Sequence, residues 1–480
     1  MRKMTLRHTL LLVLFIGMAS CRKEFLEVVP TGRLIAEKTL DYELMLNSSD
    51  LTLYSLAGFY AILGDEVAAR DPFFGTRPVK DQRLFRYEND VYNPGEDPTE
   101  LTAVTRTLYL VNKIINEVMD SKGGTDEQKR GIRAEAMTCR AWVYLHFANL
   151  YTKPYNPSTA ASDPGFPIIR EADINKTPYV RSTLKELYDF IVGDLTAAVP
   201  DLPVTITSRH RASRVVASAL LARAYLAMGR HGEALIASEN AIGALRANTG
   251  IAARLYDYNI EMLTGGALFS TTMATTGPAQ PTLPNHIESV YGKQDINGTV
   301  GSTVNHFIIT PQVASLYGAA DLRRRYYSNT GLTYPVGALR RLGPSIQPTG
   351  MNVPEIYLMR AEGRVRSNNL YGAGSAAEDL LFLRLRRMPS ASAAVPAGMT
   401  QSQMLQYVMD ERLRELAFSG LRWFDMRRMS VDPQFSAINR SHVLYFADGS
   451  TQNYPLRPER LTLRIPPRIL NDNPGMQDNP

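Results

Sequence analysis

The sequence predicts a mainly helical protein with a loop-rich irregular lobe and little β structure. Two observations support this fold class. Apolar residues recur at helical intervals in a series of segments along the chain. Residues 248–350 instead mix Gly, Pro, Ser, Thr and Asn with many tyrosines. Because so many aromatic residues argue against disorder, we expect residues 248–350 to form an ordered, surface-forming insert.

Helical periodicity outlines most of the scaffold. The predicted helices span residues 39–46, 100–119, 127–151, 183–199, 354–369 and 374–388. Ser182 or Thr183 is expected to cap the helix over 183–199, because a hydroxyl there can accept from the first free N–H groups of the helix. Residues 71–98 are rich in Pro and Gly, and we predict a long ordered loop there.

Residues 214–244 carry the clearest repeat signal. Small and apolar residues follow the tetratricopeptide spacing, with a glycine near the turn, at Leu221, Ala222, Tyr225, Gly229, Ala234 and Ser238. Small residues let two antiparallel helices cross closely, and the exposed apolar face must then be buried by neighbouring pairs. We therefore expect tetratricopeptide-like helix pairs that form a scaffold. A single amphipathic hairpin is the alternative.

The first 21 residues have the layout of a lipoprotein signal peptide. Three basic residues within the first seven precede an apolar run over 10–16, and small residues stand directly before Cys21. The run is far shorter than the ~20 residues that span a bilayer. We expect cleavage after residue 20 and lipidation of Cys21 with several acyl chains, which anchor the protein firmly. An ordinary secretory signal with a coincidental cysteine is the alternative.

Charge and cysteine content exclude some classes. Removing residues 1–20 lowers the formal charge from +6 to about +3, which is too mild to indicate nucleic-acid binding. Cys139 is then the one remaining cysteine besides Cys21, so no intramolecular disulfide is expected. Its surroundings are helical in pattern, and we interpret it as a small buried hydrophobic residue.

Residues 411–428 contain the most specific motif, ERLRELAFSGLRWFDMRR. Glu411 and Glu415 lie one helical turn apart, and Arg412 and Arg414 are expected to pair with them. The segment from Arg422 onward is interpreted as a packed helix terminus.

With these features, the chain resembles the SusD/RagB family of outer-membrane nutrient-uptake lipoproteins. The hallmark of that family, a glutamate-arginine helix with a Gly-x-Arg-Trp-x-Asp-x-x-Arg tail, is matched by Glu411, Arg412, Glu415, Gly420, Arg422, Trp423, Asp425 and Arg428. Segments 21–30, 134–144, 355–362 and 465–480 are also similar to family motifs. Ser419 and Leu421 depart from the hallmark, where an acidic residue and often His are usual.

The resemblance gives the expected domain organisation. The regions are a signal peptide (1–20), a SusD-like N-terminal region (21–210), the tetratricopeptide-like helix pair (211–247), the loop-rich insert (248–350) and a SusD/RagB C-terminal region (351–480).

The resemblance also implies a function. A SusD-like lipoprotein sits in the outer membrane, expected to face the exterior, as a lid over a SusC-like TonB-dependent β-barrel transporter. It captures an oligomeric nutrient, most often a glycan and in some members a peptide, and passes it to the barrel. No reaction is catalysed, and no cofactor, metal or nucleic acid is expected. An adaptor lipoprotein that binds no ligand is a further alternative.

Several common catalytic motifs are absent from the sequence. The histidines are scattered, and the sequence has no His-Glu-x-x-His, no phosphate-binding glycine loop and no Gly-x-Ser-x-Gly. Glu411 and Glu415 could in principle serve glycoside hydrolysis, which needs two carboxyl groups. The neighbouring arginines would keep both ionised, so a salt-bridge network is the better interpretation.

A glycan site requires aromatic rings for stacking and polar side chains for hydroxyl groups. Both types occur in the loops over 71–98 and 285–335. The candidate ligand-binding residues there are Phe85, Arg86, Tyr87, Asn89, Tyr92, Tyr291 and Asn297. Both tryptophans of the chain, Trp142 and Trp423, fall in scaffold motifs instead, which keeps peptides and smaller glycans in consideration.

Overall fold

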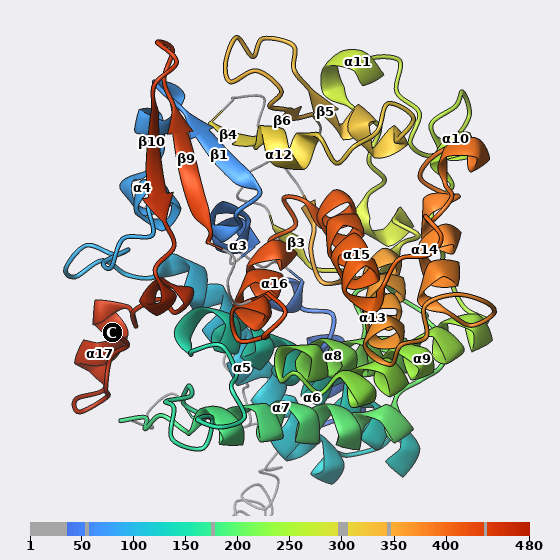
Figure 1. Cartoon of the computed structure of the whole chain (residues 1–480). Helices are drawn as coiled ribbons and strands as arrows, with labels where there is room; N and C mark the ends of the chain where they lie inside the picture. The colour runs from blue at the N-terminus through green and yellow to red at the C-terminus, as the bar shows by residue number, and fades with distance from the viewer. Residues whose placement is uncertain (1–35, 53–56, 174–177, 296–305, 343–346, 436–438) are drawn as a thin grey trace, which may run out of the picture.

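The computed structural model describes residues 36–52, 57–173, 178–295, 306–342, 347–435 and 439–480 (Figure 1). Helix accounts for 49% of the structure and strand for 7%, which confirms the predicted fold class. Cys21 and the signal peptide lie outside the described residues, as does Asn297. Within the described part, no helix has the length and apolar character of a membrane span.

Consecutive helices stack side by side to form the scaffold. Each packs on the next in the series α5 (Thr99–Glu117), α6 (Asp126–Tyr151), α7 (Leu184–Ala198), α8 (Arg214–Ala227), α9 (His231–Ala247) and α13 (Val353–Arg366) (Figure 1). Short 3-10 turns extend two of them, η4 (Val118–Asp120) and η5 (Val199–Asp201). This arrangement confirms the tetratricopeptide-like helix pairs and rules out a lone hairpin.

Local sequence signals fix the ends of these helices. Thr183 caps α7, where its hydroxyl accepts from the N–H of Glu186 at 3.1 Å, as predicted. Thr125 caps α6 in the same way. Between α8 and α9, Gly229 adopts a φ of 71°, a left-handed conformation that glycine enters without a steric penalty. Caps and a glycine turn therefore set the lengths of the helix pairs.

Close packing joins the pairs. Gly363 of α13 faces α9, where a Cβ atom on that glycine would lie 2.8 Å from Cβ of Leu235. Cys139 of α6 is 2% exposed and free, which confirms its interpretation as a buried residue. The ammonium of Lys293 reaches it from the insert, with Nζ 3.9 Å from Sγ.

Two helices carry the hallmark motif. They are α15 (Gln401–Leu416) and α16 (Leu421–Ser430), and the turn between them contains left-handed residues at Phe418 and Gly420. Trp423 is fully buried and donates from Nε1 to the carbonyl of Asn149 at 2.8 Å. This contact ties α16 to the end of α6 and confirms the packed helix terminus. The C-terminal region also contains α14 (Ala376–Arg384), η8 (Ser390–Ser392) and α17 (Pro467–Asp472).

A small sheet stands at one end of the scaffold and was not predicted in sequence. Its strands are ordered β10 (Thr451–Pro455), β9 (Ser441–Tyr445), β1 (Val67–Arg70) and β4 (Phe307–Ile309). β1 pairs antiparallel with β4 and parallel with β9. The four residues of β1 are all buried, so they lack the alternation that reveals a half-exposed strand. The sheet brings segments of the N-terminal region, the insert and the C-terminal region together (Figure 1).

The N-terminal region holds more helix than predicted. The helices α2 (Thr39–Met45) and α3 (Ala57–Leu63) pack there, with the turn η2 (Ser49–Leu51) between them. The prediction of a long loop over residues 71–98 is wrong in part, because η3 (Phe73–Thr76) and α4 (Val79–Phe85) lie within it. Pro78 does not break α4 because it stands at the N-cap, before the first helical residue.

The insert is built of short elements, as expected for an ordered irregular segment. Its helices and turns are α10 (Tyr258–Glu261), α11 (Met273–Thr276), η6 (Leu283–Asn285), α12 (Pro311–Ala314) and η7 (Leu322–Tyr326). Outside the sheet, two strand pairs lie within the insert, β3 (Gln294–Asp295) with β7 (Gln347–Pro348) and β5 (Tyr327–Ser328) with β6 (Arg340–Arg341). A third joins β2 (Ser289–Tyr291) of the insert to β8 (Met351–Asn352), which directly follows it. Buried Arg387 joins the insert to α15, bonding Glu288 at 2.6 Å and Glu415 at 2.7 Å.

Candidate functional site

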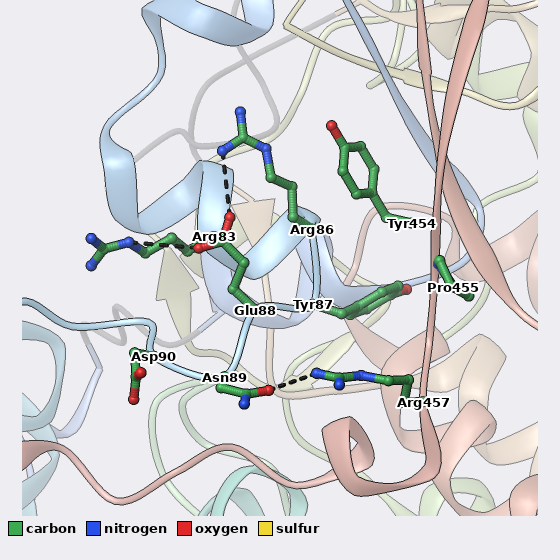
Figure 2. Close-up of a pocket in the computed structure, with 9 residues that line it drawn as sticks. All are labelled: Arg83, Arg86, Tyr87, Glu88, Asn89, Asp90, Tyr454, Pro455 and Arg457. Carbon is green, nitrogen blue, oxygen red and sulfur yellow. Dashed lines mark hydrogen bonds and ion pairs between the residues drawn. The ribbon is translucent and has the colours of Figure 1, made fainter.

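A pocket of about 570 Å³ opens beside the sheet, between the end of α4 and the end of β10 (Figure 2). Its walls come from two segments more than 350 residues apart in sequence. The lining residues are Arg83, Arg86, Tyr87, Glu88, Asn89 and Asp90 from the first segment, with Tyr454, Pro455 and Arg457 from the second.

The first wall is the C-terminal end of α4. The helix closes with a hydrogen bond from the N–H of Glu88 to the carbonyl of Arg83 at 3.0 Å, and another from Tyr87 to Leu84 at 3.1 Å. This closing motif places Tyr87 in the left-handed region, with a φ of 52°. A tyrosine there costs roughly 1–2 kcal/mol relative to its ordinary backbone conformation. Such strain is held by the surrounding contacts and concentrates at functional sites.

Below the pocket, Tyr87 is fixed by His442 of β9. The imidazole stacks between two rings, with centroids 4.4 Å from Phe85 and 4.3 Å from Tyr87. The hydroxyl of Tyr87 donates to the carbonyl of Leu63 at 3.0 Å and lies 2.9 Å from Nε2 of His442. Burial raises the pKa of Tyr87 and lowers that of His442. The floor of the pocket is therefore a rigid aromatic stack.

The second wall is the end of β10 and the residues after it. Tyr454 pairs with His442 in the sheet register and packs its ring edge-on against Phe85, with centroids 6.0 Å apart. The ring remains partly exposed. Beyond it, the guanidinium of Arg457 donates to Oδ1 of Asn89 at 2.6 Å, which closes the pocket from one wall to the other. Figure 2 shows Tyr454 beside Arg86 on one side and Arg457 with Asn89 on the other.

Arginines outnumber carboxylates in the lining of the pocket. Arg83 and Arg86 both reach Glu88, at 3.8 Å and 3.4 Å, and Arg86 also donates to Gln82 at 3.1 Å. Asp90 is bound from outside the pocket by Arg464 at 2.7 Å. The lining therefore presents three arginines with one carboxylate between two of them.

The predicted ligand-binding residues divide into two groups. Arg86, Tyr87 and Asn89 line the pocket together. Phe85, Tyr92 and Tyr291 do not offer a ring for stacking, because these residues are 0%, 5% and 2% exposed. Tyr87 is also buried, at 4% exposed, and meets the pocket as part of its floor. Tyr92 instead donates to Glu100 at 2.5 Å, Phe85 stacks on His442, and Tyr291 covers the ammonium of Lys293.

Several lining residues were missed in sequence. Arg83 lies one helical turn before Arg86, so a prediction of helix α4 would have placed the two side chains on the same face. That helix was not predicted from the sequence. Tyr454 and Arg457 carry no local signal that links them to residues 83–90. Only the pairing of β9 with β1 and β10 brings them there.

The carboxylates of the hallmark helix are structural. Glu411 is fully buried and lies 2.7 Å from Arg323, 2.8 Å from Arg384 and 2.6 Å from Arg414. Although burial opposes it, this cluster of arginines lowers the pKa of Glu411 far below its usual range. The pKa of Glu415 is lowered too, against burial, by Arg387 and Arg323. Neither group is therefore suited to donate a proton, as predicted.

One pairing in the motif differs from the prediction. Arg414 does pair with Glu411, but Arg412 binds Asp425 of α16 at 3.0 Å instead of a glutamate on its own helix. Arg428 binds the same Asp425 at 2.8 Å and reaches Glu362 of α13. Arg412 on α15 reaches Asp425 on α16 because the two helices pack against each other. The hallmark thus joins three helices.

A second cavity, of about 960 Å³, shares Pro455 with the first. It is lined by polar and aliphatic residues between residues 153–163 and the C-terminal segment, with no aromatic side chain among the described residues that line it. Without a ring to stack on a sugar, it is the weaker candidate for a glycan site.

The fold is a helical scaffold with a polar pocket beside its sheet, and comparisons with known proteins give its class. Residues 24–226 match a family model described as starch-binding and associating with the outer membrane. Residues 351–480 match the model of the SusD family. The chain belongs to the SusD/RagB family, whose members bind without catalysis and are associated with the outer membrane.

Individual relatives agree with this assignment. The chain is 25% identical over 422 residues to SusD-like protein P2 of Formosa agariphila, covering 75% of this chain and 80% of that protein. A SusD superfamily protein of Bacteroides thetaiotaomicron has a similar fold, with a TM-score of 0.67 and 18% identity over 92% of this chain and all of that one. A laminarin-binding SusD-like protein has a TM-score of 0.61 and 16% identity, covering 92% of this chain and 99% of that one.

Proposed function

We propose that this protein is a surface lipoprotein that binds an oligomeric glycan in the pocket of Figure 2 and hands it to a SusC-like TonB-dependent transporter. The observation that carries the proposal is the combination of the partly exposed Tyr454 ring with donor groups of Arg86, Asn89 and Arg457 around one open cavity. Starch and laminarin appear in the descriptions of the family model and of a similar structure, which supports a glycan ligand.

The chemistry of the pocket suits a sugar. A pyranose ring has an apolar face that stacks on an aromatic ring and a rim of hydroxyl groups that need hydrogen-bond partners. Tyr454 offers the first, and the amide and guanidinium groups offer the second. Tyr87, held in its left-handed conformation, keeps the floor of the pocket in place before any ligand arrives.

The family resemblance supports delivery of the ligand to a transporter. We propose that lipidation of Cys21 anchors the chain in the outer membrane, facing the exterior, beside its β-barrel partner. Cys21→Ala is expected to release the protein from the membrane fraction. Co-purification of the wild-type protein from detergent-solubilised outer membrane should yield a large β-barrel protein in stoichiometric amount.

Titration calorimetry on the protein beginning at residue 22 tests binding. The ligands are starch and laminarin oligosaccharides, acidic oligosaccharides and a peptide mixture. Tyr454→Ala should weaken glycan binding roughly two- to tenfold, because ring stacking contributes roughly 0.5–1.5 kcal/mol. Tyr109→Ala is the control, since Tyr109 is 40% exposed on α5, outside the pocket.

The outcomes separate the alternatives. Saturable binding of peptides without glycans would make the protein the peptide-binding lid of a transporter of the same kind. No saturable binding of either ligand would favour a structural adaptor lipoprotein. Release of shorter sugars during the titration would contradict a purely binding role.

A further inference from the structure

We infer that the glycan taken by this pocket carries negative charges, as carboxylate or sulfate groups on its sugars. The inference rests on the proposed function and names the ligand class of the same site. Its basis is that three arginines, Arg83, Arg86 and Arg457, line one cavity of about 570 Å³.

These three arginines remain accessible. The side chains of Arg83 and Arg86 are 25% and 34% exposed, and Arg457 is an exposed residue. Two of them come from the end of α4 and one from the segment after β10. In Figure 2 Arg86 lies beside Tyr454 and Arg457 reaches across to Asn89, whereas the head group of Arg83 points away from Tyr454. A ligand in the pocket therefore meets positive charge on two sides.

Their charges are only partly compensated inside the pocket. Glu88 is shared by Arg83 and Arg86 at 3.8 Å and 3.4 Å, distances longer than a close ion pair. Arg457 bonds to a neutral amide, that of Asn89. The remaining carboxylate of the lining, Asp90, is bound by a fourth arginine, Arg464.

Buried arginines elsewhere in the chain form closer ion pairs than the arginines of the pocket do. Arg140 bonds both carboxylate oxygens of Asp194, at 2.7 Å and 2.8 Å. Arg223 bonds both oxygens of Glu355, at 3.0 Å and 2.7 Å. These buried pairs are bidentate and close. The contrast indicates that the arginines of the pocket retain donor capacity for a ligand.

A charged ligand would complete this arrangement. Positive side chains that line one cavity repel one another, and an anion bound in the cavity reduces that repulsion. The planar guanidinium fork matches the two oxygens of a carboxylate or sulfate better than a single hydroxyl group. A neutral sugar could stack on Tyr454 but would leave the positive charges uncompensated.

Matched oligosaccharides test the inference by titration calorimetry on the protein beginning at residue 22. An oligogalacturonate supplies carboxylates, a sulfated oligosaccharide and its desulfated form supply the sulfate comparison, and a laminarin oligosaccharide of equal length is the neutral probe. We expect at least one anionic probe to bind roughly tenfold or more tightly than its neutral counterpart, and this advantage should shrink as salt is raised. Whichever anionic probe binds identifies the charged group.

Charge-removing variants locate the effect. Arg86→Gln and Arg457→Gln should each weaken anionic binding about tenfold, the typical loss for one charge-assisted hydrogen bond. Arg457 is exposed, so its variant is expected to fold even if Arg86→Gln does not. Arg246→Gln, which removes an exposed arginine on α9, should leave binding unchanged.

Two results would overturn the inference. One is equal or tighter binding of neutral glycan that depends on Tyr454 but not on the arginines, which leaves the proposed function intact. The other is binding of acidic peptides without acidic glycans, which moves the ligand to another class. Failure of every glycan to bind, charged or neutral, instead removes the proposed function itself.

Discussion

Asn479, the penultimate residue of the chain, accepts a hydrogen bond from Nη2 of Arg181 at 2.9 Å. Its amide nitrogen donates to the carbonyls of Tyr151 and Leu463, at 2.9 Å and 2.7 Å. One buried side chain thus connects the C-terminus, the end of α6 and the segment before α7. The closing segment of the family resemblance acts as a latch on the scaffold.

Breaking this latch should destabilise the protein. Asn479→Ala removes the side-chain donor of the Leu463 carbonyl, whereas the Tyr151 carbonyl still accepts from Nη2 of Arg181 at 3.1 Å. One unsatisfied buried group costs roughly 1–3 kcal/mol. We expect a loss of about 1–3 kcal/mol in the free energy of unfolding, measured by urea denaturation. Gln477→Ala is the matched control, since Gln477 is an exposed amide that bonds Arg181 through its main-chain carbonyl. Equal stability of both variants would contradict the latch.

Glu411→Gln should destabilise the protein strongly. The change removes a buried charge that lies within 3 Å of Arg323, Arg384 and Arg414. Arg323 keeps Asp321 and Glu415, but Arg384 and Arg414 lose the carboxylate that pairs with them. Removing one partner of a buried ion pair typically costs about 3–5 kcal/mol. Asp410→Asn, one residue earlier on the same helix, changes a carboxylate that contacts the exposed Gln406 and should cost less than about 0.5 kcal/mol. A loss of similar size in both variants would argue against a special role of the cluster.

Two glycines near the α8–α9 turn should respond in opposite directions to alanine. Gly229 has a φ of 71°, so Gly229→Ala should cost about 1–2 kcal/mol although no atom lies within 4 Å of the added Cβ. Gly232 lies in the first turn of α9 and has open space around it, so Gly232→Ala should stabilise the protein by about 0.5–1 kcal/mol. Thermal unfolding of the two variants checks the pair. Shifts of the same sign would mean that backbone conformation does not decide the effect.

Glu66 should make stability depend on pH. Burial, followed by the charge of Asp65, raises the pKa of Glu66 from 4.5 to about 8. Between these values the folded protein keeps a proton that the unfolded chain has lost, so Glu66 lowers stability as pH rises and contributes a constant cost above about pH 8. The slope approaches roughly 1.4 kcal/mol per pH unit.

Glu66→Gln removes this contribution and keeps an acceptor for the N–H of Phe418, which bonds Oε1 at 3.3 Å. The variant should gain stability relative to wild type as pH is raised from 5 to 8, in a series of urea unfolding measurements across that range. Parallel pH profiles for the two proteins would show that Glu66 ionises normally in the fold.

Much of the helical scaffold could be predicted because its signals are local. The helix expected over 183–199 is α7 with its Thr183 cap, and the helix expected over 127–151 is α6, which begins one residue earlier. Hydrophobic periodicity and capping act within a few residues, so they are readable without a tertiary structure. Helix α4 was not predicted, because Pro78 favours a loop in the sequence pattern although it stands just before the first helical residue.

The candidate site was only half predictable. The choice of residues 85–92 found Arg86, Tyr87 and Asn89, but composition could not tell which rings face inward. Phe85 and Tyr87 are drawn into the stack around His442, a residue more than 350 positions away. The pairing of Arg412 with Asp425 likewise could not be predicted, because it depends on how α16 packs against α15.

The sequence by itself determined the helix pairs, their turn glycine and the hallmark motif, because periodicity, capping and left-handed backbone conformation are set by neighbouring residues. Only the tertiary structure decided the sheet and the pocket. Pairing of β1 with β4 and β9 depends on chain segments hundreds of residues apart, and it places Tyr454 and Arg457 opposite Arg83 and Arg86. The positive charge of the pocket arises from that meeting, since neither segment alone surrounds a cavity.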